Sequence, residues 1–401
     1  MSTHRFLTSW LISLFLIFNT TMAVAESSVE KQDVYSVENV TSVDVKYVDD
    51  TLHLLLGKKI QGQDSLWYQY SHDQAKTWSD AVNITEGLSI EARFNRGNDA
   101  RLAVQGNHIV VVWMSKKEGA PHNSGPMKAM VSHDAGQNWQ EIESPADWQG
   151  GSHGFFAMDA NDKAISLAWL DSRKDAGKGA AQGLQYSTSF DGGTTWSKNT
   201  TLDDRSCACC WNTAYFNGDD FYVLYRDKDP SDMAVGRVNS QQQWQRLSTV
   251  GQFNWDFQGC PHIGGSLVFD DQNKLFHATV GTGHDKYSGA FYLNSTNLGQ
   301  SWSEPVQLGD ETAVHSDVAV TEDGNLLAAW DYISDKGFQV VYASSVDQGK
   351  TWRAPIQISQ SGVRATHPRV IAMKDSFLLL WTEGKERKPH VLHSERIILG
   401  E

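Results

Sequence analysis

Hydrophobic and polar positions alternate along the chain in a hairpin pattern that recurs seven times. In each copy an alternating apolar strand leads into a tight polar turn, and a second apolar strand follows. Alternation with a period of two is typical of strands that bury one face. The turns centre on Asp49, Gly106, Asn161, Gly218, Gln272, Asp323 and Asp375. Asp, Asn and Gly supply the positive φ angles that tight hairpins need, so each copy predicts a β-hairpin.

These turns are spaced roughly 51 to 57 residues apart over most of the chain, a regularity that indicates a repeat architecture. We therefore predict an all-β protein, a β-propeller with seven four-stranded blades. The last hairpin is followed by one further apolar strand at 390–395, so its blade lacks an outer strand. We expect the N-terminal segment 34–40 to supply that strand and close the ring, which would remove an exposed sheet edge.

A second motif follows most of the hairpins. Its fullest copy reads S-F-D-G-G-T-T-W at 189–196, and a remnant spans 239–244. Four other copies begin at Ser71, Ser132, Ser295 and Ser345. The Asp can accept backbone N–H bonds, the Gly can take a strained conformation, and the Trp can bury its ring between sheets. The motif is therefore interpreted as a structural turn.

The motif resembles the Asp-box, or BNR repeat, of sialidases and other β-propellers, and the resemblance covers residues 40–396. It implies an Asp-box propeller, and because sialidases have six blades, a six-bladed ring is the alternative. The family pattern implies three arginines that bind the substrate carboxylate, one of them within an R-I-P motif. This sequence has no R-I-P motif, so no catalytic residue of the family is carried over.

The first 25 residues have the features of a secretory signal peptide. Arg5 supplies a positive charge, 6–18 is an apolar run too short to span a bilayer, and 23–25 has the small-x-small pattern of a cleavage site. An uncleaved anchor is the alternative. We expect an exported protein, periplasmic or secreted, in which residues 26–401 form a single Asp-box propeller domain.

Charge and composition narrow the range of partners. The formal net charge is −14, and the sequence has no block of Lys and Arg. Nucleic acid and anionic lipid are therefore excluded as expected partners. No segment after the signal peptide is long and apolar enough to predict a membrane span.

Cysteine and histidine gather just before the predicted first strands of several blades. His153, Cys210, His315 and His367 hold equivalent positions ahead of their turns, and the other three cysteines lie close to Cys210 or enter the next blade. Loops at such positions open on one face of a propeller, around its channel. Thiolate and imidazole suit Cu(I) or Zn(II). We predict a transition-metal site, with copper ahead of zinc, formed from Cys207, Cys209, Cys210, Cys260, His262, His315, His367 and His153.

Disulfide formation is the alternative for the cysteines, because an exported protein meets an oxidising compartment. A bridge from the segment 207–210 to Cys260 would be less strained than one between adjacent residues. One bridge with the remaining cysteines as ligands is also compatible with the sequence.

Charged residues near the same face are candidates for acid–base work. They are Asp99, Arg226, Asp227, Asp331, Arg369 and Glu383. They favour a sialidase-like glycoside hydrolase as a second interpretation. A non-catalytic propeller that binds a glycan or a protein is the third, since the propeller fold alone does not specify an activity.

Overall fold

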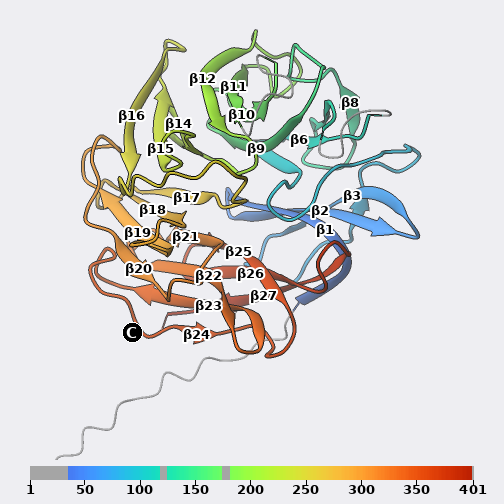
Figure 1. Cartoon of the computed structure of the whole chain (residues 1–401). Helices are drawn as coiled ribbons and strands as arrows, with labels where there is room; N and C mark the ends of the chain where they lie inside the picture. Colours follow the sequence, from blue (N-terminus) through green and yellow to red (C-terminus); the bar gives the residue numbers. More distant parts are fainter. Residues whose placement is uncertain (1–34, 118–123, 174–180, 400–401) are drawn as a thin grey trace, which may run out of the picture.

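The computed structural model describes residues 35–117, 124–173 and 181–399 (Figure 1). Every helix or strand in these ranges is a β-strand, which confirms the all-β prediction. No helix of the described ranges is long and apolar enough to cross a membrane. The two termini of the described chain come together in one sheet, where β1 runs antiparallel to the last strand, β27.

Five sheets have four antiparallel strands each, and each uses consecutive strands of the chain. The first two sheets contain β5 (Arg101–Gln105), β6 (His108–Met114), β7 (Met127–Ser132), β8 (Gln140–Ile142), β9 (His153–Ala160), β10 (Ile165–Asp171), β11 (Ala181–Ser189) and β12 (Thr200–Cys207). The next two contain β13 (Thr213–Asn217), β14 (Asp220–Arg226), β15 (Met233–Val238), β16 (Trp244–Val250), β17 (Gly265–Asp270), β18 (Leu275–Thr282), β19 (Gly289–Ser295) and β20 (Val306–Leu308). The fifth contains β21 (Ser316–Val320), β22 (Leu326–Ser334), β23 (Gly337–Ser345) and β24 (Ile356–Gln357).

The sixth sheet has seven strands in the order β25-β26-β27-β1-β2-β3-β4. Its strands are β25 (Ala365–Ala372), β26 (Phe377–Glu383), β27 (His390–Ile397), β1 (Tyr35–Val48), β2 (Thr51–Ile60), β3 (Gln63–Ser71) and β4 (Val82–Asn83). The long strand β1 joins two halves of this sheet. Its first residues pair with β27, Tyr35 opposite Ser394, and its remaining residues pair with β2, Val48 opposite Thr51.

All seven predicted hairpins are present as antiparallel strand pairs, namely β1–β2, β5–β6, β9–β10, β13–β14, β17–β18, β21–β22 and β25–β26. Positive φ occurs at three of the seven predicted turn residues, Asp49 (φ 48°), Gly106 (φ 55°) and Gly218 (φ 60°), and not at the other four. The first strand of each hairpin contacts the first strand of the next, and β25 also contacts β1. This arrangement of sheets is that of a β-propeller.

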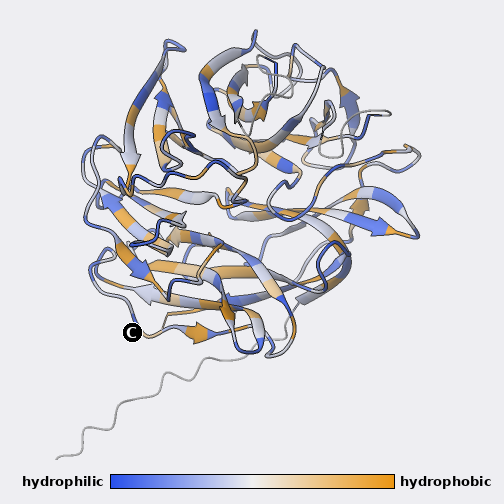
Figure 2. Ribbon diagram, in the orientation of Figure 1, coloured by the Kyte–Doolittle hydropathy of each residue, from blue (hydrophilic) through white to orange (hydrophobic). Residues whose placement is uncertain are grey.

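The apolar core lies between successive sheets. Figure 2 shows hydrophobic and hydrophilic residues alternating along many strands, so each strand can bury its apolar side chains against a neighbour. In one such layer Val112 and Met127 of one sheet pack with Phe156 and Trp169 of the next. Burying a large apolar side chain of this kind contributes about 1.5–3 kcal/mol.

The Asp-box turns use their polar atoms internally. In the fullest copy Ser189 Oγ donates to Asp191 Oδ1 (2.8 Å), which also accepts the Thr195 backbone N–H (2.8 Å). Gly193 has φ 90°, and a Cβ there would lie 2.1 Å from Val110, so only glycine fits. The Trp196 ring packs on the core, and its Nε1–H donates to the Gly193 carbonyl (3.2 Å). This geometry fits the structural role predicted for the motif.

Candidate functional site

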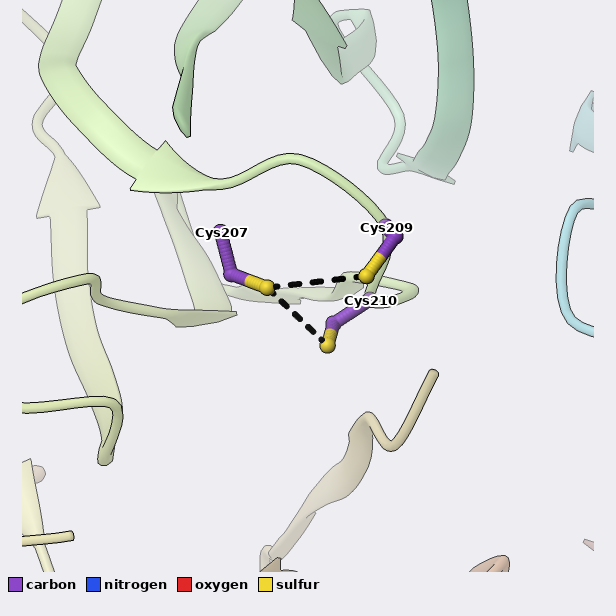
Figure 3. A group of neighbouring side chains, drawn as sticks. All are labelled: Cys207, Cys209 and Cys210. Carbon is purple, nitrogen blue, oxygen red and sulfur yellow. Dashed lines mark hydrogen bonds between the residues drawn. The ribbon is translucent and has the colours of Figure 1, made fainter. Parts of the chain in front are cut away.

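Three cysteines come together where the chain passes from one sheet to the next. Cys207 ends β12, and Cys209 and Cys210 lie in the short connection to β13 (Figure 3). The turn points the three sulfurs toward one another: Cys207 Sγ lies 3.8 Å from Cys209 Sγ and 3.4 Å from Cys210 Sγ. All three side chains are buried, and Phe155 packs against them. Because their ligand atoms lie within 4.8 Å of one another, these three residues, here called the cysteine cluster, can hold one ion.

None of the four cysteines forms a disulfide. Cys260 is exposed, in the segment without regular structure that precedes β17, and it belongs to neither of the metal-competent groups found among the described residues. His262, two residues later, is also exposed and also belongs to neither group.

A buried arginine lies beside the cysteine cluster. Arg226, at the end of β14, donates to the carbonyls of Ile263 (2.9 Å), Ser231 (2.5 Å) and Gly281 (2.6 Å). No carboxylate in the described ranges forms an ion pair with it. Hydrogen bonds with Cys209 and Cys210, reinforced by the positive charge of Arg226, hold the pKa of the Cys207 thiol far below its ordinary value. The environment therefore favours a thiolate at Cys207, whereas the hydrogen bond with Cys207 raises the pKa of Cys209 and burial raises that of Cys210.

A second group joins His315, Asp331 and His367. His315 Nδ1 lies 2.6 Å from Asp331 Oδ2, which also accepts the backbone N–H of His367 (2.9 Å). The two imidazole rings stack with their centroids 3.8 Å apart. Burial, followed by the charge of His315, lowers the pKa of His367 well below its ordinary value, so its ring is neutral at physiological pH.

The two histidines line a small cavity of about 20 Å³ among the first strands of several sheets. Trp211, adjacent in sequence to Cys210, forms part of the wall and lies against both rings, with centroids 5.5 Å from His315 and 6.1 Å from His367. Arg96, Arg101 and Arg369 also line this cavity, here called the channel pocket. Trp211 thus connects the neighbourhood of the cysteine cluster to that of the histidine pair.

His153, which the sequence placed with the other ligands, occupies a different environment. Its Nε2 lies 2.6 Å from the Trp148 carbonyl and its Nδ1 3.2 Å from the Gly125 carbonyl. Burial lowers its pKa. Each ring nitrogen faces a backbone carbonyl, and His153 is in neither metal-competent group.

The charged candidates divide between two places. Asp99 and Arg369 line the channel pocket, together with His315 and His367. Asp331 belongs to the same group as these two histidines. Arg226 lies by the cysteine cluster, and its neighbour Asp227 pairs with Arg246 (3.0 Å) and has a pKa raised mainly by burial. Glu383 accepts a hydrogen bond from Trp381 Nε1 (2.9 Å) and belongs to neither group.

Two features of the pocket were not predicted from the sequence. They are Trp211 and the aspartates that pair with two of the pocket arginines. Asp44 pairs with Arg101 (2.9 Å), and Asp317 pairs with Arg369 (3.3 Å). The adjacency of Trp211 to Cys210 was the available signal. The two aspartates lie within strands β1 and β21, where the sequence pattern gives no indication of a partner.

Comparison with solved structures identifies the class of fold. An ulvan lyase from a new polysaccharide lyase family, bound to -[GlcA(1-4)Rha3S]-, superimposes with a TM-score of 0.60 at 13% identity, over 91% of this chain and 94% of that chain. A Trypanosoma rangeli sialidase in complex with 2,3-difluoro-KDN gives 0.50 at 16% identity, over 76% of this chain and 53% of that chain. No protein-family model and no curated protein matches the sequence. The chain has the sialidase-like β-propeller fold that its Asp boxes imply, and identities this low speak for the fold alone.

Proposed function

We propose that this protein is an exported β-propeller that binds a soft transition-metal ion, Cu(I) ahead of Zn(II), at the cysteine cluster. The observation that carries the proposal is the convergence of three buried sulfurs, 3.4 and 3.8 Å from Cys207 Sγ. Thiolate sulfur is the donor that Cu(I) prefers, and three such donors without a bridging disulfide form a ready ligand set.

The electrostatics of Arg226 support this proposal. A buried guanidinium without a carboxylate partner is costly, because burial removes a charge from water without compensating it. A thiolate-rich metal centre carries net negative charge, since three thiolates outweigh the charge of one Cu(I) or one Zn(II). Such a centre would supply the counter-charge that Arg226 lacks.

The fold details that go with this function are also proposals. Seven consecutive hairpins, together with the division of the seven-stranded sheet at β1, support seven blades with a ring closed between β1 and β27. The N-terminal features at 1–25 support export, followed by action in the periplasm or outside the cell. N-terminal sequencing of the protein recovered from outside the cytoplasm tests the proposal of export, and the expected first residue is Glu26.

A Cu(I) titration against a colorimetric chelator, under anaerobic conditions and without a purification tag, tests the metal proposal. The unchanged protein and the Cys260→Ser control are expected to bind about one Cu(I) per chain. The double variant Cys207→Ser/Cys210→Ser is expected to lose this binding, because only the Cys209 sulfur remains in the cysteine cluster. Equal loss in the Cys260→Ser control would contradict the proposed ligand set.

Counting free thiols in the metal-free protein separates the metal from the disulfide interpretation. Four reactive thiols after denaturation are expected. Two reactive thiols or none, together with a lower thermal stability in reducing agent and no release of metal, would show that the cysteines form stabilising disulfides. That result would overturn the metal proposal.

Glycan binding at the channel pocket is the second candidate function. Trp211 lines this pocket together with Arg96, Arg101 and Arg369, whose charges are paired with Asp99, Asp44 and Asp317. The likeness to lyase and sialidase folds supports a glycan ligand more than a protein ligand. A binding array of acidic oligosaccharides, followed by a hydrolysis assay on any that bind, tests both the binding and the glycoside hydrolase interpretation. Arrays and assays without signal would contradict both.

A further inference from the structure

A pair of imidazole rings lies in the wall of the channel pocket, apart from the cysteine cluster. His315 directly precedes β21 and His367 lies within β25, and the rings stack at an interplanar angle of 19°. Both line the pocket, so an ion from solvent can reach them without crossing the apolar layers between the sheets. The neighbouring strands β21 and β25 bring together two side chains that are distant in sequence.

Asp331 holds both histidines in place. Its Oδ1 accepts the backbone N–H of His315 (3.1 Å), and its Oδ2 accepts that of His367 (2.9 Å). Oδ2 also lies 2.6 Å from His315 Nδ1. An ionised carboxylate only accepts hydrogen bonds, so Nδ1 carries the proton and Nε2 carries the lone pair. A carboxylate that fixes the tautomer in this way is the usual outer partner of a metal-ligating histidine.

His367 is kept in an unfavourable backbone conformation. Its φ is 54°, in the left-handed region, at a bulge in β25. Arg96 Nη2 donates to its carbonyl (2.9 Å) and Asp331 accepts its N–H, so the conformation is fixed from both sides. Its Nδ1 is buried without a hydrogen-bond partner among the described residues. Backbone strain of this kind clusters at functional sites, so an unpaired ring nitrogen held there indicates a ligand position.

The charges around the pair leave room for a cation. Each of the three arginines that line the pocket is matched by an aspartate: Arg96 by Asp99 (2.7 Å), Arg101 by Asp44 (2.9 Å) and Arg369 by Asp317 (3.3 Å). Asp331, in contrast, forms no ion pair with any lysine or arginine in the described ranges. Its negative charge beside two imidazoles is therefore available to a bound ion.

We propose that His315 and His367 form a second metal site, which takes a borderline divalent ion such as Zn(II) or Cu(II), with Asp331 as its positioning residue. Imidazole nitrogen suits these ions, whereas the sulfurs of the cysteine cluster suit Cu(I). Two protein ligands leave coordination positions open toward the pocket, where water or a solute can bind. This site goes beyond the proposed function and does not rest on it.

Co(II) binding to the full chain that carries Cys207→Ser/Cys210→Ser isolates this site, because Co(II) reports its ligands by absorption. About one Co(II) per chain is expected, with visible d–d bands, no sulfur-to-cobalt charge transfer, and displacement by Zn(II). Adding His315→Ala or His367→Ala is expected to remove the bands. Adding His262→Ala, which removes an exposed imidazole outside the pocket, is expected to leave them unchanged.

Adding Asp331→Asn is expected to weaken Co(II) affinity about 10- to 100-fold and to shift the d–d bands, as loss of an orienting partner does. Thermal unfolding confirms that each variant is folded, and His315→Gln replaces His315→Ala where it is not. The inference is overturned if the Cys207→Ser/Cys210→Ser chain binds no Co(II), or if both histidine variants bind it as tightly as that parent chain. Failure of the unchanged protein to bind Cu(I) would overturn the proposed function and leave this second site standing.

Discussion

The Asp-box turns and the channel face are built on the same repeat, and they use it in opposite ways. In four boxes the Ser Oγ lies 2.8–2.9 Å from the Asp Oδ1, and the same bond recurs at Asn297 (2.9 Å) in a fifth. On the channel face the equivalent positions hold different groups: His153 faces backbone carbonyls, Cys210 belongs to the cysteine cluster, and His315 and His367 share Asp331. The Asp-box turns repeat the same bond, as expected of a turn that stabilises each blade. The side chains at the channel-face positions differ from one blade to the next, as expected of a binding site.

Histidine shows the same contrast. In two sheets a buried histidine bonds a tyrosine of the adjacent strand: His53 Nδ1 lies 2.7 Å from Tyr68 Oη, and His277 Nδ1 lies 2.6 Å from Tyr292 Oη. These repeated pairs join neighbouring strands. Among the described residues no other two histidines stack as His315 and His367 do, and the partner of this pair is a carboxylate from another strand.

The largest effect that we expect is a loss of stability on acidification, caused by the repeated histidine–tyrosine pairs. Burial lowers the pKa of His53 and of His277 from 6.5 to about 4. Between these values the unfolded chain binds protons that the folded chain does not. The contribution of the two histidines to the free energy of unfolding is therefore at its maximum above pH 6.5, and it decreases as the pH drops toward 4. The loss is on the order of a few kcal/mol. Urea unfolding at a series of pH values measures it.

The variant His277→Gln tests the assignment of that loss. Its free energy of unfolding should depend less steeply on pH between 6.5 and 4 than that of the unchanged protein. An unchanged slope would mean that the acid sensitivity lies elsewhere, and the structural reading of the repeated pairs would be wrong.

A somewhat smaller effect is expected for Trp196→Ala, which truncates the fullest Asp box. The half-buried indole packs on the core between two sheets, so its loss should lower the free energy of unfolding by about 3 kcal/mol. Cu(I) stoichiometry should stay unchanged in the folded variant. Intact stability with loss of metal or ligand binding would reverse the contrast between the two faces.

The smallest effect is expected for Asp191→Ala in the same turn. This change removes the acceptor for the Thr195 backbone N–H (2.8 Å) and hydroxyl (2.6 Å), bonds that are exposed to solvent. The free energy of unfolding should fall by about 1 kcal/mol. The matched change Asn297→Asp, which restores the common residue in a divergent box, should alter it by less than about 0.5 kcal/mol. A larger cost for Asn297→Asp than for Asp191→Ala would show that the boxes are not equivalent.

The sequence by itself determined the repeat. Period-two alternation, turn residues with positive φ and the S-x-D-x-G-x-T-W spacing are local properties, and they predicted the seven hairpins and the internally bonded turns of the structure. Among the residues that it grouped, Cys207, Cys209 and Cys210 converge in the structure, and His315 meets His367.

Only the tertiary structure decided which candidates meet. The sequence joined all eight cysteine and histidine residues into one site, but the direction of each side chain depends on how its loop packs. Cys260 and His262 are exposed, His153 faces backbone carbonyls, and the other five residues belong to two separate groups. The partners that give these groups their electrostatic character, Arg226 and Asp331, come from other strands, and contacts between distant strands leave no periodic trace in the chain.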